Sequence, residues 1–183
     1  VYGKPDNLPV DESSIFKKAE SPYAETKQIC EKILKESSIN SISLRYFNPI
    51  GAHESGLIGD CSADKPANLV PIICEVAKGV REKLIINGKD YKTIDGTCVR
   101  DYIHVNDIVR AHYYGLKKFR QKKCVLNYNI GSGKGYSVLE IINGIEKVTR
   151  VKLKIIFKKK RKGDPPILVA DCKKILRDLK WKP

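Results

Sequence analysis

Apolar residues recur with helical spacing in the segment that follows Ser21-Pro22. Serine before proline is typical of an N-cap and first helical position, because proline lacks the N–H that would be unpaired there. Residues three or four apart share one helix face, so the pattern predicts a helix that begins at Pro22 and ends over residues 35–38. Its apolar stripe consists of Ile29, Ile33 and Leu34.

Strand patterns and helical patterns alternate along the rest of the chain. The expected strands are Ser41–Phe47, Lys83–Asn87, Val125–Ile130 and Lys152–Phe157, and Asn48–Pro66 is expected to be a loop. The expected helices are Leu69–Lys78, a helix capped by Asn106 or Asp107 that reaches Phe119, and one that opens with the capping box Ser137–Glu140. This alternation predicts the α/β class, a sheet with helices around it.

A glycine cluster, Gly131–Gly135, follows one expected strand and precedes a helix. It has neither the Gly-x-x-x-x-Gly-Lys-Ser/Thr pattern nor the full Gly-x-Gly-x-x-Gly fingerprint. We therefore interpret it as a structural turn rather than a phosphate loop.

Composition is that of a soluble globular protein, with 42% hydrophobic and 31% charged residues in 183. This length allows one ordinary domain or parts of two. No apolar run approaches the ~20 residues of a membrane span, and no secretory signal opens the chain. The six cysteines form no Cys-x-x-Cys pair, which suits a reducing cytoplasm and indicates no metal site. Cys30 and Cys74 lie in helical patterns and are expected to be small core residues.

The net charge of +14 is compatible with a nucleic acid or with an acidic small-molecule ligand. Basic residues gather at Lys117–Lys123 and Lys158–Lys162. Because no zinc finger, RNP motif or helix-turn-helix pattern accompanies them, we expect solvated loops and no nucleic-acid partner. Arg161 is the exception treated below.

Tyr23 and Lys27 are four residues apart on the first predicted helix, so they share one face. A nearby ammonium and a helix N-terminus both favour the ionised form of a phenol, which could then act as a general base. The alternative is a surface helix that carries an unrelated aromatic and a solvated lysine.

Three further motifs accompany this pair: Leu44–His53, Asp95–Val105 and Arg161–Asp164. With them, the sequence from Val1 to Pro183 resembles the UDP-glucose 4-epimerase family of the extended short-chain dehydrogenase/reductase superfamily. The resemblance implies part of a Rossmann-like doubly wound parallel sheet plus a smaller α/β substrate domain. Residues 1–50 and 99–131 would belong to the NAD-binding domain, and 51–98 and 132–183 to the UDP-sugar domain.

The resemblance also implies the chemistry: transient oxidation of a UDP-hexose at C4 by bound NAD, in galactose metabolism. Tyr23 would take and return the 4-OH proton, and Lys27 would bind the nicotinamide ribose. Tyr46 would lie beside the nicotinamide and the sugar. The full-length protein would be a cytoplasmic homodimer.

No dinucleotide-binding fingerprint occurs in these residues, and Val1-Tyr2-Gly3 resembles the end of a later strand of the family. We therefore expect a C-terminal portion of the enzyme that lacks the N-terminal NAD-binding βαβ unit. Such a fragment should bind NAD poorly and lack epimerase activity by itself.

Several more positions match substrate-binding residues of that family. They are Tyr46, Phe47, Asn48, Asn68, Leu69, Ile85, Ile86, Asn87, Arg100, Arg161, Asp164 and Leu168. Arg100 and Arg161 would hold the diphosphate, because guanidinium offers a fixed fork of donors. Asp164 would contact the ribose or uridine. Each position also has a structural interpretation, such as an ion pair, strand core or turn.

Two departures from the family pattern bear on specificity. Asn87 stands where an aromatic residue usually lies near the uracil, and Leu168 where a tyrosine or cysteine distinguishes UDP-hexoses from N-acetylated sugars. Leucine is intermediate in size, which leaves that choice open. Two alternatives remain: another nucleotide-sugar dehydratase or decarboxylase of the superfamily, and a non-catalytic sugar-nucleotide or nucleic-acid binding module.

Overall fold

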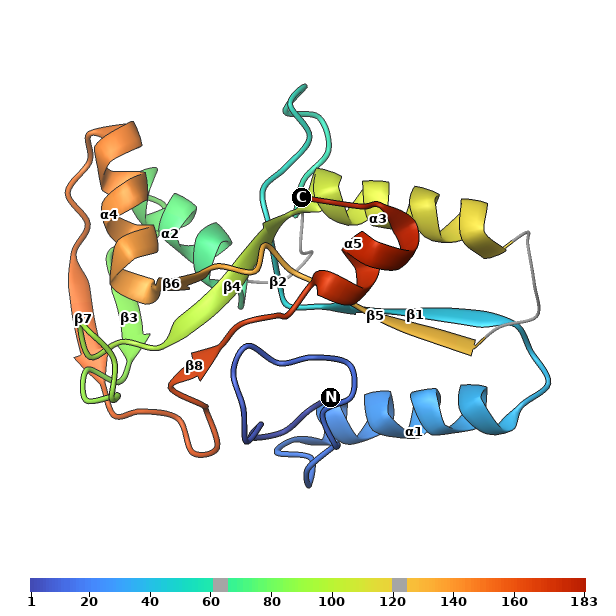
Figure 1. The fold of residues 1–183 in the computed structure, drawn as a ribbon. Coiled ribbons are helices and arrows are strands. Elements are labelled where there is room, and N and C mark those ends of the chain that lie inside the picture. The colour runs from blue at the N-terminus through green and yellow to red at the C-terminus, as the bar shows by residue number, and fades with distance from the viewer. Residues whose placement is uncertain (61–65, 120–124) are drawn as a thin grey trace. The chain divides into compact units, whose positions relative to one another are not determined.

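The computed structural model describes residues 1–60, 66–119 and 125–183, and Figure 1 shows their helices and strands. Cys61, Cys124, residues 120–123 of the first basic run and part of the expected 48–66 loop lie outside the described residues. The chain forms two compact units. Unit 1 comprises Val1–Pro49, Asp101–Lys134 and Leu168–Pro183; unit 2 comprises Ile50–Arg100 and Gly135–Ile167.

Unit 1 contains a pair of parallel strands, β1 (Ser41–Tyr46) and β5 (Val125–Ile130), in the register Ser41↔Val125 to Tyr46↔Ile130. Helices α1 (Pro22–Glu36) and α3 (Val105–Phe119) lie on opposite sides of this pair (Figure 1). A last helix, α5, spans Lys173–Leu179.

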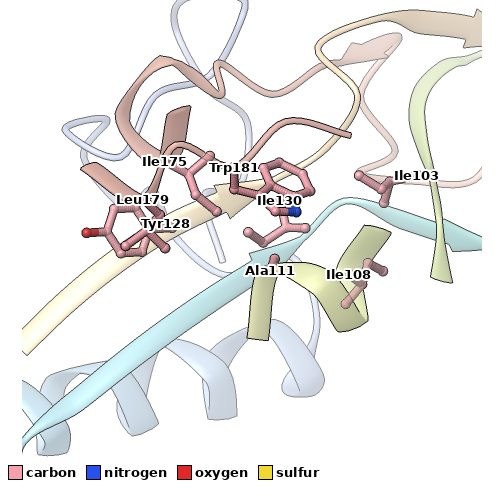
Figure 2. Close-up of a cluster of buried hydrophobic side chains, with 8 residues drawn as sticks. All are labelled: Ile103, Ile108, Ala111, Tyr128, Ile130, Ile175, Leu179 and Trp181. Carbon is pink, nitrogen blue, oxygen red and sulfur yellow. The ribbon is translucent and has the colours of Figure 1, made fainter. Parts of the chain in front are cut away.

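The hydrophobic core of unit 1 joins β5, α3 and the C-terminal segment (Figure 2). Its buried members are Ile103, Ile108, Ala111, Tyr128, Ile130, Ile175, Leu179 and Trp181. Trp181 is 1% exposed, and its indole Nε1 donates to the Asp107 carbonyl at 3.1 Å. Burying so large a ring, with its polar atom satisfied, ties the C-terminal segment to this unit.

Unit 2 contains a second parallel pair, β3 (Leu84–Asn87) and β7 (Ile155–Lys158), with helices α2 (Leu69–Ala77) and α4 (Val138–Thr149). Ser137 accepts from the Glu140 N–H at 3.0 Å while the Glu140 side chain accepts from the Ser137 N–H at 2.7 Å, so the predicted capping box is confirmed. The core of this unit consists of Ile73, Val76, Leu84, Ile86, Val138, Ile142 and Leu153.

The remaining strands are β2 (Asn48–Ile50), β4 (Val99–His104), β6 (Gly135–Ser137) and β8 (Ile167–Leu168). Their sheet has the order β2-β4-β6, and β8 pairs with β4. The α/β class is therefore confirmed, with parallel strand pairs in both units.

Sequence pattern missed β2, β4, β6, β8 and α5. The short strands β2 and β8 offer too few positions for a periodic pattern. In β4 two buried charged residues, Arg100 and Asp101, interrupt the apolar pattern. Polar groups enter a core only when they are hydrogen-bonded, and that partnership cannot be seen in a hydropathy pattern.

Three local expectations need correction. Helix α3 begins at Val105 and not at a cap of Asn106 or Asp107; instead the Asn106 N–H donates to His104 Nδ1 at 3.2 Å. Cys30 and Cys74 are exposed rather than buried, and no residue of α1 is buried. Helical spacing identifies the apolar face, but it does not say whether that face is covered within the same chain.

The C-terminal stretch is divided between the two units. We expected 132–183 to belong wholly to the substrate domain, whereas the compact units divide it after residues 134 and 167. Ile175, Leu179 and Trp181 supply the physical reason, because they pack in the core of unit 1. None of the helices among the described residues is long and apolar enough to cross a membrane.

Candidate active site

Helix α1 brings Tyr23 and Lys27 together at its first turns. Ser21 Oγ accepts from the Ala24 N–H at 3.2 Å, and Pro22 occupies the first helical position, as the sequence predicts. The Lys27 Nζ lies 5.2 Å from the centroid of the Tyr23 ring. The Tyr23 side chain is 72% exposed, so its hydroxyl can reach a ligand while the cation stays beside it.

Tyr46, at the end of β1 in the same unit, is paired with His112 of α3. Its hydroxyl lies 2.7 Å from His112 Nε2, and His112 Nδ1 lies 2.9 Å from the Ile108 carbonyl oxygen. A carbonyl only accepts, so in the neutral ring Nδ1 carries the hydrogen and Nε2 accepts from the tyrosine. Burial raises the pKa of the Tyr46 phenol, which therefore stays a donor.

Sequence reasoning missed His112. No motif links positions 46 and 112, which are 66 residues apart. The sequence signals only that Tyr46 ends an expected strand and that His112 lies within an expected helix. Phe47 and Asn48, which follow Tyr46, are half-buried, and the Phe47 N–H donates to the Ile130 carbonyl at 3.0 Å.

Unit 2 brings together Arg100 and Asp164, which the sequence assigned separately to the substrate. The guanidinium donates to the Asp164 carboxylate and, at 2.8 Å, to the Val99 carbonyl. The Arg100 side chain is only 10% exposed and that of Asp164 29%. A half-buried charge is costly unless it is paired, so each of these residues needs the other in this structure.

Tyr91 extends this pair, and sequence reasoning did not single it out. Its hydroxyl donates to the second carboxylate oxygen of Asp164 at 3.4 Å. Burial raises the pKa of the Tyr91 phenol, and the negative charge of Asp164 adds to the shift. Arg161 precedes Asp164 in the same turn, in which the Asp164 N–H donates to the Arg161 carbonyl at 3.4 Å.

The other predicted substrate residues are spread over three elements. Asn68 precedes α2 without a side-chain capping bond, and Leu69 begins that helix. On β3, Ile85 is 41% exposed whereas Ile86 is 4% exposed and packs in the core, so Ile86 can offer a ligand only its backbone. Asn87 ends β3 and is half-buried, as is Leu168 of β8.

Backbone N–H groups of the glycine cluster bind a carboxylate of the same chain, that of Asp101. Asp101, fully buried in unit 1, accepts from the Ser132 N–H (2.7 Å), the Gly133 N–H (3.0 Å) and the Ala170 N–H (3.1 Å). At Gly131 a Cβ would lie 2.4 Å from the Asp101 Oδ2. The interpretation of this cluster as a structural turn is therefore confirmed, because a carboxylate occupies the donors that a phosphate would need.

A metal centre finds no support in the part of the chain that the structure describes. No group of three or more His, Cys, Asp or Glu side chains gathers there in a way that could hold a metal ion.

Comparison with known proteins places this geometry in a family. The model of the NAD dependent epimerase/dehydratase family matches residues 1–131. UDP-glucose 4-epimerase 4 of Oryza sativa subsp. japonica is 44% identical over 188 residues, which cover 100% of this chain and 51% of the rice protein. The UDP-glucose 4-epimerase of Dictyostelium discoideum is 43% identical, with 100% and 54% covered.

Solved structures agree. The UDP-glucose 4-epimerase from Bifidobacterium longum in complex with NAD+ and UDP has a TM-score of 0.94 and 41% identity, covering 100% of this chain and 56% of that one. The enzyme from Stenotrophomonas maltophila, with bound NAD and formylated UDP-arabinopyranose, also has a TM-score of 0.94 and 41% identity, with 100% and 55% covered. The chain thus spans about half the length of the curated relatives it matches. It belongs to the NAD dependent epimerase/dehydratase family.

Proposed function

We propose that the whole protein carrying this sequence is an NAD-dependent UDP-glucose 4-epimerase, an isomerase that interconverts UDP-glucose and UDP-galactose. The observation that carries the proposal is the Tyr23–Lys27 pair, with the ammonium 5.2 Å from the ring centroid. This pair lies in a chain that aligns over its full length with UDP-glucose 4-epimerases at about 40% identity.

The donor set of unit 1 suits the nicotinamide ribose of NAD. Lys27 offers an ammonium, and Tyr23 and Tyr46 offer phenols that are 72% and 44% exposed, which are suitable partners for sugar hydroxyls. Bound NAD would supply the hydride acceptor and donor.

Tyr23 would act as the base and the acid of the cycle. It would accept the proton of the 4-OH and hold it while the sugar is in its 4-keto form. It would then return that proton to the same oxygen, so no proton is gained or lost over the cycle. Lys27, whose ammonium lies 5.2 Å from the Tyr23 ring centroid, would orient the ribose. His112 holds the Tyr46 hydroxyl in a fixed direction through the 2.7 Å contact.

Arg100, Arg161 and Asp164 of unit 2 would bind the nucleotide half of the substrate. The Arg100–Asp164 pair keeps both charges satisfied when no ligand is bound, and a diphosphate could take over donors of the guanidinium. The half-buried setting strengthens such a contact relative to one in water.

The same proposal includes a homodimer in the cytoplasm, acting in galactose metabolism. Helix α1 exposes Ile29 (50%) and Ile33 (59%), an apolar face that a second copy could cover. Sedimentation of the whole protein at micromolar concentration tests the dimer, and Ile33→Glu should shift it toward monomer.

Product analysis tests the proposed reaction. The whole protein is incubated with UDP-galactose and the products are identified by proton NMR. We expect UDP-glucose, formed without net consumption of NAD. A product that has lost water would contradict the epimerase assignment and support a dehydratase, and release of carbon dioxide from a UDP-uronate would support a decarboxylase.

A further inference from the structure

Unit 2 contains a surface cavity, largely open to solvent, at the carboxyl ends of its paired parallel strands. Asn87 of β3 is the register partner of Lys158 of β7, so these two strand ends lie side by side. The Gly88 N–H donates to the Lys158 carbonyl at 2.8 Å, which joins the segments that follow β3 and β7. The cavity has a volume of about 690 Å³ and is lined by Lys89, Asp90, Lys158, Lys159 and Lys160.

The lining is strongly cationic, with four lysines and a single carboxylate. Asp90 pairs with Lys160 at 2.9 Å, and both side chains are more than half exposed. Lys89, Lys158 and Lys159 form no ion pair with any carboxylate of the described residues. Like charges at such spacing repel one another, and an anion with several charges would offset that repulsion.

Aromatic rings help to position two of the lysines. The Lys89 Nζ lies 4.9 Å from the Phe157 ring centroid, and the Lys160 Nζ lies 5.8 Å from that of Tyr91. The loop between β3 and β4 is also braced, because the Tyr91 N–H donates to the Gly96 carbonyl at 3.0 Å. The cationic lining is therefore partly ordered before any ligand arrives.

The chemistry of the lining points to a ligand class. Ammonium groups bind phosphate as point charges, and several of them close together suit a ligand that carries several linked negative charges. Base-stacking sites use aromatic rings, and the two rings beside the lining, those of Phe157 and Tyr91, already contact the ammonium groups of Lys89 and Lys160. We propose that this cavity binds a compact oligophosphate, a small molecule or chain with three or more linked phosphate groups.

Calorimetric titration of the chain with sodium tripolyphosphate tests the proposal. The variant Lys89→Gln/Lys158→Gln/Lys159→Gln removes three cationic groups of the lining. The control Lys18→Gln/Lys35→Gln/Lys182→Gln removes three exposed lysines of unit 1 and changes the net charge equally. We expect the cavity variant to weaken tripolyphosphate binding at least about tenfold and the control to leave it almost unchanged.

Two further titrations identify which phosphate compounds the cavity binds. A nucleoside triphosphate should bind with the same dependence on the three lysines, and inorganic monophosphate should bind far more weakly. Equal losses in the cavity variant and the control would overturn the proposal, as would tight binding of oligothymidylate in place of tripolyphosphate. Circular dichroism of each variant confirms that the fold is kept. The result is independent of the epimerase assignment, because UDP affinity is measured separately with Arg100 and Arg161 variants.

Discussion

Tyr23–Lys27 in unit 1 and Arg100–Asp164 in unit 2 are two candidate site pairs that are built in opposite ways. The first joins residues four apart on one helix, and its ring is 72% exposed. The second joins residues 64 apart, and its guanidinium side chain is 10% exposed. A local exposed pair forms with its helix and leaves its hydroxyl free to react. A buried non-local pair needs the folded unit, and in return acts with less screening by water.

Helix α3 shows what spacing alone does not establish. Tyr113 and Lys117 are also four residues apart, and the Lys117 Nζ lies 4.5 Å from the Tyr113 ring centroid. The Tyr113 ring is 55% exposed, so the two helices carry nearly the same local arrangement. The Tyr23 pair differs in lying at a helix N-terminus and in its family context, which makes the Tyr113 pair a natural control.

The largest effect is expected from Tyr23→Phe in the whole protein. The substitution keeps the ring and removes the proton-transfer group, so turnover should fall by ~10²–10⁴ while UDP binding is retained. Tyr113→Phe should leave turnover unchanged. Initial rates with UDP-galactose measure both variants. Near wild-type turnover of the Tyr23 variant would break the distinction between the two tyrosine–lysine pairs.

Asp101→Asn tests how much a buried carboxylate with distant partners contributes to stability. The amide can accept fewer of the N–H bonds that the carboxylate accepts, and its own NH₂ would face the backbone donors of the Gly131–Gly133 turn. The free energy of unfolding should fall by about 2–4 kcal/mol, as measured by urea denaturation. Asp6→Asn is the control: its side chain is 72% exposed, so its pair with Lys17 should contribute about 0–1 kcal/mol.

Arg161→Ala should weaken UDP binding by the whole protein roughly ten- to hundredfold, because a charge-assisted contact contributes about 1.5–3 kcal/mol. Lys158→Ala should leave UDP affinity unchanged. For tripolyphosphate the order should be reversed, with Lys158→Ala the more damaging change. Calorimetry with both ligands gives the four values. If both substitutions act alike on both ligands, Arg161 is only part of a solvated basic run.

The smallest effect concerns the pH dependence of stability. Tyr2 is 5% exposed and donates to Asn129 Oδ1 at 2.5 Å, and burial raises the pKa of its phenol to about 12. Because this pKa is raised on folding, the stabilisation is present below pH ~10 and is lost as the pH rises toward ~12. The parent should lose about 1–2 kcal/mol more than Tyr2→Phe across this range.

Parallel measurements on Tyr136→Phe provide the reference, since Tyr136 is 40% exposed. A difference between the parent and Tyr2→Phe that stays constant from pH 9 to 12 would show that the Tyr2 phenol does not titrate in this interval. Urea denaturation at each pH supplies the free energies.

The local features of this protein follow from its sequence. Helix α1 with its Ser21 cap, the strands β1 and β5 as separate elements, and the capping box of α4 were all predicted from the pattern, because each depends on residues that are close together in the sequence. The Tyr23–Lys27 contact is of the same kind. Such contacts depend on backbone periodicity, which a linear pattern records directly.

Only the tertiary structure decided which distant polar groups meet. It paired Tyr46 with His112, Arg100 with Asp164, and Asp101 with the Gly131–Gly133 turn. It also left the apolar face of α1 uncovered and placed Trp181 in the core of unit 1. The physical reason is that a buried polar or charged group is stable only with partners that long-range folding supplies, and hydropathy along the chain carries no record of those partners.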